Sequence, residues 1–357
     1  MVLLEEVIVP HIVFIVGEYY PYFSAVGVCC FNIAEEMAKN NKVTVICSKS
    51  RINEPELESY QGHTIIRTSY KWWDKRLNLN EKIKNSSGLL NKWFKTRLDV
   101  VRAKEYFQVI LSRVSINRDL ANVYLNALGK IQEPVDTIIP FCYPMEAVYA
   151  GMKFKRKNPS VKLIPYLFDP FVESHTLHRT NWNRKIKKEA NLKIEKSMLE
   201  LSNKLFCANH LYQHFAKFNT KPGLVVATEH PLLKRKMDNV LPKHNGKSSK
   251  TIITYTGVFD QYVRNPEYFF RLMRIVLSKF KAETHLYTYG NCKDIVDRYI
   301  KQGKIIDHGY VPKKEADTAV VNSNILISIG NRDNTQAPSK IFEYMSSGKP
   351  IIHLYSA

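Results

Sequence analysis

Residues 11–48 read HIVFIVGEYYPYFSAVGVCCFNIAEEMAKNNKVTVICS, and this stretch decides the fold class. After the opening histidine its first residues are all apolar, which is typical of a strand buried on both faces of a sheet. A loop with glycine, proline and serine follows, then helical spacing over residues 29–40 and a second apolar run over 42–47. A strand, a helix and a strand in this order predict a parallel α/β fold.

The same alternation continues along the chain. Further strands are predicted at residues 64–67, 135–140, 161–168, 204–207, 224–228, 251–256, 284–289, 304–308, 325–329 and 350–354. Helices are predicted at 145–156, 184–201, 266–280, 293–301, 313–322 and 339–347. Residues 234–250 are rich in Lys, Asn, Pro, Gly and Ser and predict a linker. We therefore predict two Rossmann-like domains, residues 1–233 and 251–357, that face a cleft.

Residues 70–122 interrupt this alternation and predict a basic helical insertion in the first domain. Residues 71–120 hold 12 Lys and Arg against 5 Asp and Glu. Lysine and arginine also flank four aromatic residues, Trp72, Trp73, Trp93 and Phe94. Such a combination is typical of a surface that binds an anionic membrane. The alternative is that the aromatic side chains are core and that the charges solvate a helix face.

Composition limits the classes of function. With 357 residues the chain is longer than most single-core domains, and its formal net charge is +20. This charge suits phosphorylated substrates, an anionic membrane or nucleic acid, but the sequence carries no zinc-ligand spacing or nucleic-acid reader motif. The cysteines form no pairing motif and predict buried, reduced thiols. Without a signal peptide or a bilayer-spanning apolar run, the sequence predicts a cytoplasmic protein, peripheral at most to the inner face of the membrane.

Residues 331–353, NRDNTQAPSKIFEYMSSGKPIIH, are the most informative for function. They predict a loop after a strand, then a helix that opens near Pro338 and stops at Gly348. Backbone N–H groups at a helix start bind phosphate, and Lys340 adds a positive charge there. Ser339 and Glu343 share one helix face, where the carboxylate can accept hydrogen bonds from a ribose diol. The alternative is an exposed helix with an incidental glutamate.

The stretch SKIFEYMSSGKPII at 339–352 resembles the nucleotide-sugar site of GT-B glycosyltransferases, especially the family 4-type group. Other stretches resemble the same group in the expected order: residues 9–48, TIITYTGVFDQYVRNP at 251–266, HLYTYG at 285–290 and IIDHGYVPKKEADTAVVNSNILISIG at 305–330. The resemblance spans nearly the whole chain and is weakest in the insertion. It implies an acceptor-side first domain and a second domain that binds a nucleotide sugar. Because GT-B chains usually continue with further helices, we expect the second domain to be incomplete.

The resemblance also implies roles for individual residues. Glu343 would bind the donor ribose, while Ser339, Lys340 and the adjacent amides would hold the diphosphate. Three further residues are implied at the donor site: Gly257, which lets backbone approach the phosphates, Arg264 as the basic partner there, and Gly27 in the loop after the first strand. A retaining reaction is implied, and no metal is required, because basic groups can neutralise the leaving diphosphate.

Two departures from the family pattern affect the expected chemistry. Thr335 occupies the place of the first of two glutamates, which normally contacts the sugar. Asp169, after the apolar run at 161–168, takes the place of a sugar-contacting histidine. At the carboxyl edge of a strand, Asp169 could accept an acceptor proton or stabilise positive charge at the sugar, which makes it the candidate catalytic residue. The alternative is an Asx-turn residue before Pro170.

Together these features predict a glycosyltransferase in surface polysaccharide or glycoconjugate synthesis. Its donor would be a UDP- or GDP-linked sugar, and its acceptor a glycan or a lipid-linked molecule. The alternative is a non-catalytic GT-B-like accessory protein that binds a nucleotide sugar, which the replaced glutamate favours.

Overall fold

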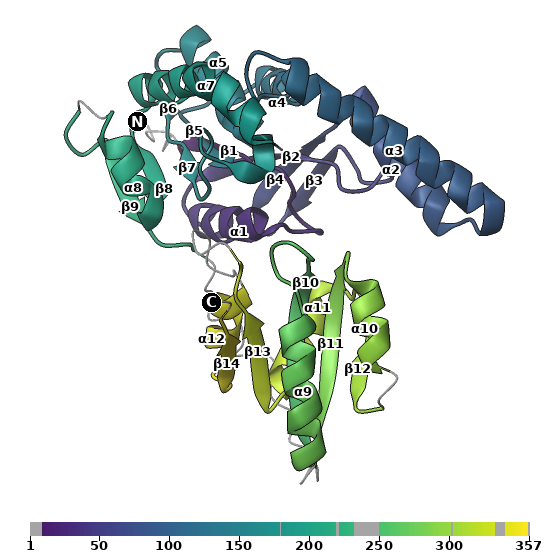
Figure 1. Ribbon diagram of the computed structural model, residues 1–357. Helices are drawn as coiled ribbons and strands as arrows, with labels where there is room; N and C mark the ends of the chain where they lie inside the picture. Colours follow the sequence, from purple (N-terminus) through teal and green to yellow (C-terminus); the bar gives the residue numbers. More distant parts are fainter. Residues whose placement is uncertain are drawn as a thin grey trace. The chain divides into compact units, whose positions relative to one another are not determined.

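The structure is a computed structural model that describes residues 9–178, 180–218, 221–231, 250–300, 303–332 and 340–355. The chain divides into two compact units, Met1–Pro231 and Leu232–Ala357. Apart from Lys250, the predicted linker lies outside the described residues. Each unit is built on one sheet of mainly parallel strands with helices around it (Figure 1). The α/β fold class is therefore confirmed.

In the sheet of the first unit, the first strand of the chain lies in the middle. Its strands are β1 (His11–Ile15), β2 (Lys42–Ser48), β3 (Leu57–Tyr60), β4 (His63–Thr68), β5 (Thr137–Cys142), β6 (Lys162–Leu163), β7 (Tyr166–Leu167), β8 (Leu205–Ala208) and β9 (Val225–Thr228). They pair in the order β3-β4-β2-β1-β5-β7-β8-β9, with β6 beside β5. Because the order reverses at β1, which pairs with both β2 and β5, the carboxyl edge between β1 and β5 is a topological switch point.

Two predictions of element bounds in this unit were wrong. The helix predicted at 29–40 is α1 (Ala25–Met37), which begins earlier because the Ser24 hydroxyl caps it by accepting from the Gly27 N–H at 3.1 Å. The strand predicted at 161–168 is split into β6 and β7, since Pro165 lacks the N–H that a ladder needs.

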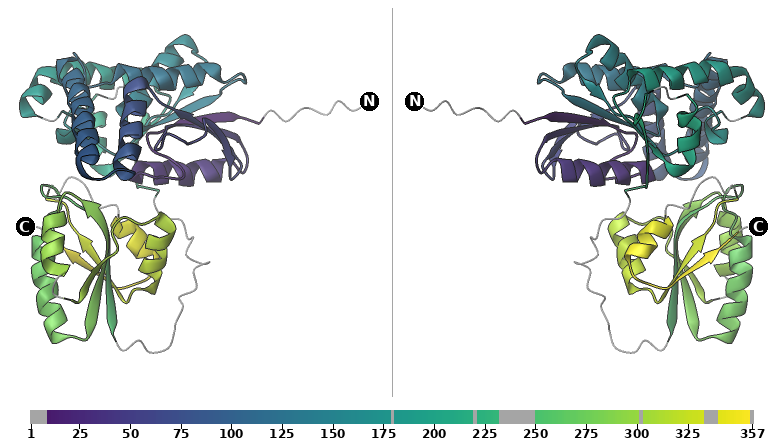
Figure 2. Two further views of the ribbon diagram at one scale, coloured as in Figure 1. Left: turned by 90° about the vertical axis from the view of Figure 1, so that its right-hand side faces the viewer. Right: turned by 90° about the vertical axis from the view of Figure 1, so that its left-hand side faces the viewer.

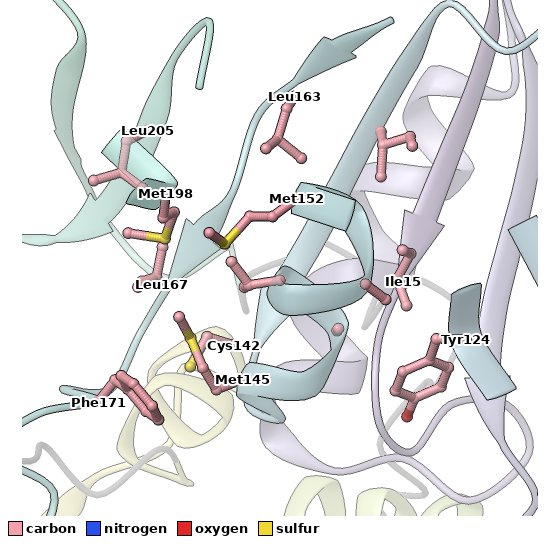
Figure 3. Close-up of a cluster of buried hydrophobic side chains, with 14 of the residues drawn as sticks. Ile15, Tyr124, Cys142, Met145, Met152, Leu163, Leu167, Phe171, Met198 and Leu205 are labelled. Atoms are coloured by element: carbon pink, nitrogen blue, oxygen red, sulfur yellow. The ribbon is translucent and has the colours of Figure 1, made fainter. Parts of the chain in front are cut away.

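Helices cover both faces of this sheet. The helices after α1 are α2 (Lys71–Lys84), α3 (Gly88–Leu111), α4 (Arg118–Lys130), α5 (Met145–Lys157), α6 (His175–His178), α7 (Asn181–Leu201) and α8 (Asn209–Ala216). Helix α1 packs on one face, α4 and α5 pack on the other, and α7 packs on α5 (Figure 1). Side chains from β1, β7, α5 and α7 meet in the main core, where Met152, Leu167 and Met198 gather (Figure 3).

The predicted basic insertion contains a helical hairpin made of α2 and α3, which lie side by side and project beyond the sheet (Figure 1). Of the four aromatic residues that the sequence analysis selected in this hairpin, three contact the protein itself. Trp72 and Phe94 pack on a small cluster of Leu79, Leu98 and Val101, and the Trp73 indole donates to the Lys49 carbonyl at 2.7 Å. Only Trp93 of the four is largely exposed. Packing within the protein thus accounts for three of the four aromatic residues, Trp93 is left facing outward, and membrane binding stays a prediction.

The second unit has a five-stranded parallel sheet. Its strands are β10 (Thr251–Phe259), β11 (Ala282–Gly290), β12 (Ile305–Asp307), β13 (Ile325–Ile329) and β14 (Ile351–Leu354), in the order β12-β11-β10-β13-β14. Helices α9 (Glu267–Lys279) and α10 (Lys293–Ile300) cover one face, and α11 (Lys313–Asn322) and α12 (Lys340–Ser346) the other (Figure 2). This order is that of a Rossmann half, and its switch point lies between β10 and β13.

All six cysteines lie within the described residues and are buried and free: Cys29, Cys30, Cys47, Cys142, Cys207 and Cys292. Burial raises the pKa of every one of these thiols, for example to about 11 at Cys207. The predicted buried, reduced thiols are confirmed.

Candidate functional site

The candidate donor site lies at the carboxyl edge of the second unit's sheet, where β10 ends next to β13. Gly257 in β10 has φ +150°, a conformation that side chains disfavour. A Cβ there would lie 3.1 Å from the Tyr255 hydroxyl and 3.8 Å from Nη1 of Arg264. The structure thus brings the two predicted residues Gly257 and Arg264 together, and it explains why a glycine stands at this point of the strand.

A tight loop after β10 holds Arg264 in place. The Asp260 carboxylate accepts from the backbone N–H groups of Tyr262 and Val263 at 2.8 and 2.9 Å. The backbones of Asp260 and Arg264 exchange two hydrogen bonds, at 2.8 and 3.2 Å. Asn291, just after β11, donates its amide to the same carboxylate at 3.1 Å. Since Asp260 closes the loop through backbone contacts, the position of Arg264 is set before any ligand binds.

The Arg264 guanidinium is held at this edge of the sheet by a contact with a neighbouring side chain. Its Nη2 donates to the Asn331 side chain, after β13, at 2.6 Å. Its Nε is buried and has no hydrogen-bond partner among the described residues. Burial raises the pKa of the neighbouring Tyr255 to about 12 although the Arg264 charge opposes this, so Tyr255 stays neutral. Arg264 therefore supplies a fixed positive charge beside Gly257.

Helix α12 is fastened to β10 by one buried side chain. The Tyr344 hydroxyl accepts from the Thr256 N–H at 2.7 Å and donates to the Thr256 carbonyl at 3.1 Å, and it lies 3.0 Å from the Thr256 hydroxyl. Thr256 immediately precedes Gly257. The tyrosine therefore positions its neighbour Glu343, on α12, relative to the end of β10. It is a positioning residue of the candidate site that the sequence prediction missed.

Glu343 forms the centre of a charged cluster. Its Oε2 accepts from Lys340 at 2.8 Å and from Lys313, at the start of α11, at 3.2 Å. Lys313 also donates to Asp317 at 2.8 Å. Burial acts to raise the pKa of Glu343, but the two ammonium groups outweigh it and hold that pKa below the ordinary value. The carboxylate is therefore ionised and shared between two lysines.

Lys313 was not among the predicted site residues. The only signal for it in the sequence was its place at the first position of a helix after the GYVP turn, within a stretch already recognised as similar to the donor domain. Lys340 and Glu343 were predicted, and the structure brings them together. Ser339 and Thr335 lie outside the described residues.

The two predicted residues of the first unit have different surroundings. Gly27 was expected in a loop open to a ligand, but it is buried in the first turn of α1. A Cβ there would lie 2.1 Å from the Glu18 carbonyl oxygen, so Gly27 lets α1 pack against the segment after β1. Asp169 follows β7 by two residues and is half-buried. Its charge adds to burial in raising the pKa of Cys142, which places it near the end of β5.

The described part of the chain holds no group of three metal-ligating side chains. Within the same ranges, no helix combines the length and apolar character needed to cross a membrane. The sequence matches no protein-family model and no curated protein.

Solved structures, in contrast, match nearly the whole chain. Sucrose-phosphate synthase from Thermosynechococcus elongatus is 12% identical, with 96% of this chain and 81% of that chain covered and a TM-score of 0.57. The catalytic domain of starch synthase IV from Arabidopsis thaliana, bound to ADP and acarbose, is 10% identical, with coverage of 97% and 83% and a TM-score of 0.57. A putative UDP-N-acetylglucosamine 2-epimerase from Listeria monocytogenes is 10% identical, with coverage of 96% and 78% and a TM-score of 0.52.

These likenesses define the fold. The chain has the GT-B fold, with a doubly wound α/β sheet in each unit. At such low identity the fold is what is shared, and the three similar proteins carry more than one activity. The activity of this chain has to be argued from its own residues.

Proposed function

We propose that this protein is a glycosyltransferase that moves a sugar from a UDP- or GDP-linked donor to a glycan or a lipid-linked acceptor. The observation that carries the proposal is the cluster of Glu343, Lys340 and Lys313, fastened by Tyr344 beside Gly257 and at the same sheet edge as Arg264. Open α/β sheets bind ligands at this edge, next to the switch point. Two lysines that share one carboxylate, with a third cation at the same sheet edge, suit a ligand that carries both phosphates and hydroxyl groups.

Donor binding would exchange the partners within this cluster. The diphosphate is a stronger acceptor for Lys340 and Lys313 than one shared carboxylate, and it would draw their ammonium groups away from Glu343. Glu343 would then accept hydrogen bonds from the ribose diol. Arg264, Ser339 and the backbone at Gly257 would complete the phosphate contacts. Gly27 has a packing role in the structure, and a ligand contact there stays a prediction.

The chemical step needs cations beside the leaving diphosphate and a carboxylate beside the sugar and the acceptor hydroxyl. As the bond to the sugar breaks, negative charge develops on the leaving diphosphate, and fixed cations stabilise it without a metal ion. Asp169 of the first unit would stabilise positive charge at the sugar or accept a proton from the acceptor hydroxyl. The family resemblance favours retention of the anomeric configuration, in a branch that has Thr335 in place of the first motif glutamate.

The acceptor side of the proposal rests on charge. A net charge of +20 suits work at an anionic bilayer, where lipid-linked intermediates of surface polysaccharide or glycoconjugate synthesis are presented. We propose a cytoplasmic protein that attaches peripherally to the inner face of the membrane.

A screen of UDP-, GDP- and CMP-sugars by thermal shift, followed by turnover of the best radiolabelled donor, tests the proposal. Ligand at about 100 times its Kd stabilises the native state by about 2.7 kcal/mol, which is easily measured. Transfer of label to an acceptor lipid or glycan supports the glycosyltransferase. Tight binding without transfer would favour the second candidate, a nucleotide-sugar-binding accessory protein. The replacement of the first motif glutamate by Thr335 favours this candidate. Absence of binding by every donor would contradict both.

A further inference from the structure

Helix α3 carries two separate apolar stripes. One consists of Phe94, Leu98 and Val101, spaced by four and three residues, and it packs against α2. The other consists of Leu89, Trp93, Val100, Phe107 and Leu111, spaced by four, seven, seven and four. Since an α-helix turns once every 3.6 residues, both spacings keep their residues on one side, and the two sides differ. We name the second stripe the outer face of α3.

The outer face is exposed along its whole length. Its five side chains have between 51% and 85% of their surface exposed. The helix has 24 residues and is about 36 Å long at 1.5 Å per residue. A row of five exposed, large apolar side chains on one side of a helix is unusual for a surface that contacts only water, and it marks an interaction site.

The hairpin that carries the outer face is positively charged. Residues 71–111, which cover the hairpin, hold ten Lys and Arg against four Asp and Glu, a net charge of +6. The Arg97 guanidinium lies 4.6 Å from the centre of the Trp93 ring, and the Lys104 ammonium lies 4.2 Å from that of Trp72. Cations held against aromatic rings in this way stand at the border between apolar and charged surface.

We propose that the outer face of α3 is the part of this protein that lies on a membrane, with its apolar side chains among the lipid acyl chains and the hairpin's cations over anionic headgroups. A surface helix with tryptophan, phenylalanine and leucine on one side and basic residues on the others is the pattern of an interfacial helix. The net charge of +6 selects this occupant over a second copy of the chain, because two such hairpins would repel each other.

This inference deepens the proposed function. Membrane binding by the outer face is argued from the hairpin alone, and only its biological purpose rests on the proposed function, since a lipid-linked acceptor is presented at a bilayer surface. It also replaces the surface predicted from the sequence. Trp72, Trp73 and Phe94 hold the hairpin together and fix it to the protein body, whereas Trp93 is the predicted aromatic residue that faces outward.

Sedimentation of the full chain with lipid vesicles tests the inference. The vesicles are phosphatidylcholine alone or with about 30% phosphatidylglycerol, at low and high salt. The test variant is Trp93→Ser/Phe107→Ser. Its matched control is Ile275→Ser/Phe280→Ser in the second unit, where the two side chains are 52% and 64% exposed. Circular dichroism and urea unfolding confirm that both variants fold, which is expected because all four side chains are largely exposed.

The wild type should bind the anionic vesicles and lose binding at high salt. The test variant should lose at least tenfold in vesicle affinity, and the control less than twofold. Equal wild-type binding to neutral and anionic vesicles, absence of binding, or an unchanged test variant would overturn the inference. So would a wild-type dimer, seen by gel filtration, that the test variant dissociates while vesicles are not bound. Calorimetric titration of the same proteins with the nucleotide sugar reports separately on the proposed donor site, so that its failure cannot be mistaken for failure at the membrane.

Discussion

Replacement of Tyr344 by phenylalanine tests how the candidate donor site is held together. The substitution removes one hydroxyl and keeps the ring, which is fully buried against Val320 and Leu326. The hydroxyl accepts from the backbone N–H of Thr256 at 2.7 Å and donates to the carbonyl of the same residue at 3.1 Å. Without the hydroxyl this N–H loses its acceptor inside the protein.

The expected loss of stability follows from these contacts. A buried hydrogen bond contributes about 1 kcal/mol net, and a buried donor left without a partner costs about 1–3 kcal/mol. Because phenylalanine leaves almost no cavity, other terms are small. We therefore expect Tyr344→Phe to lower the free energy of unfolding of the second unit by about 2–3 kcal/mol, and to weaken donor binding as Glu343 loses its fixed position.

Urea unfolding followed by two probes measures this effect. All four tryptophans, Trp72, Trp73, Trp93 and Trp182, lie in the first unit, so their fluorescence reports on that unit while circular dichroism reports on both. Tyr268→Phe, which removes an exposed hydroxyl from α9, is the matched control and should change stability by less than about 0.5 kcal/mol. If Tyr344→Phe matches this control in the circular dichroism transition, the anchoring role assigned to Tyr344 is wrong.

Three further predictions concern charge and thiols. In calorimetric titration, Lys340→Ala should lower the affinity for a nucleoside diphosphate more than the affinity for the bare nucleoside, because Lys340 would bind phosphate. Equal losses of affinity would contradict this. The hydrogen bond that the His214 imidazole donates to the Glu195 carboxylate raises the pKa of His214. The stability that this contact contributes is therefore complete below the unfolded histidine pKa near 6.5, and it is lost as the pH rises through the folded value. Unfolding free energy between pH 6 and 8 should therefore fall more steeply in the wild type than in His214→Gln, and parallel curves would refute the assignment. Because burial raises the pKa of all six cysteine thiols, a thiol reagent should label the native protein slowly and the urea-unfolded protein completely, and rapid labelling of the native protein would contradict the burial described here.

The fold could be predicted from the sequence to the level of its α/β rhythm. Short apolar runs of strand length separated by helical spacing identified the sheet strands β1, β2 and β10, because buried parallel strands have to be apolar on both faces. Local capping could not be predicted as well. Ser24 begins α1 before the apolar periodicity does, and this moved Gly27 from an expected loop into a helix.

The candidate site could be predicted only where a sequence motif is contiguous. Lys340 and Glu343 are three residues apart on one helix, so their proximity is a property of helical spacing. Lys313 and Tyr344 act through contacts between elements 30 and 88 residues apart, which no local pattern reveals. The insertion shows the same limit: the sequence identified its aromatic residues and charges, but packing between α2 and α3 decides which of them face outward.

The central claim is that Glu343 and its two lysines bind a nucleoside diphosphate sugar. Calorimetric titration of the wild type and of Glu343→Gln, with the donor selected by the thermal-shift screen and with its bare nucleoside, tests this claim most directly. Glu343→Gln loses a charge-assisted hydrogen bond to the ribose, worth about 1.5–3 kcal/mol. Its affinity for the bare nucleoside should therefore fall at least tenfold. Its affinity for the diphosphate sugar should fall less, because the substitution also frees Lys340 and Lys313 for the phosphates. Wild-type affinity of Glu343→Gln for the bare nucleoside would contradict the account.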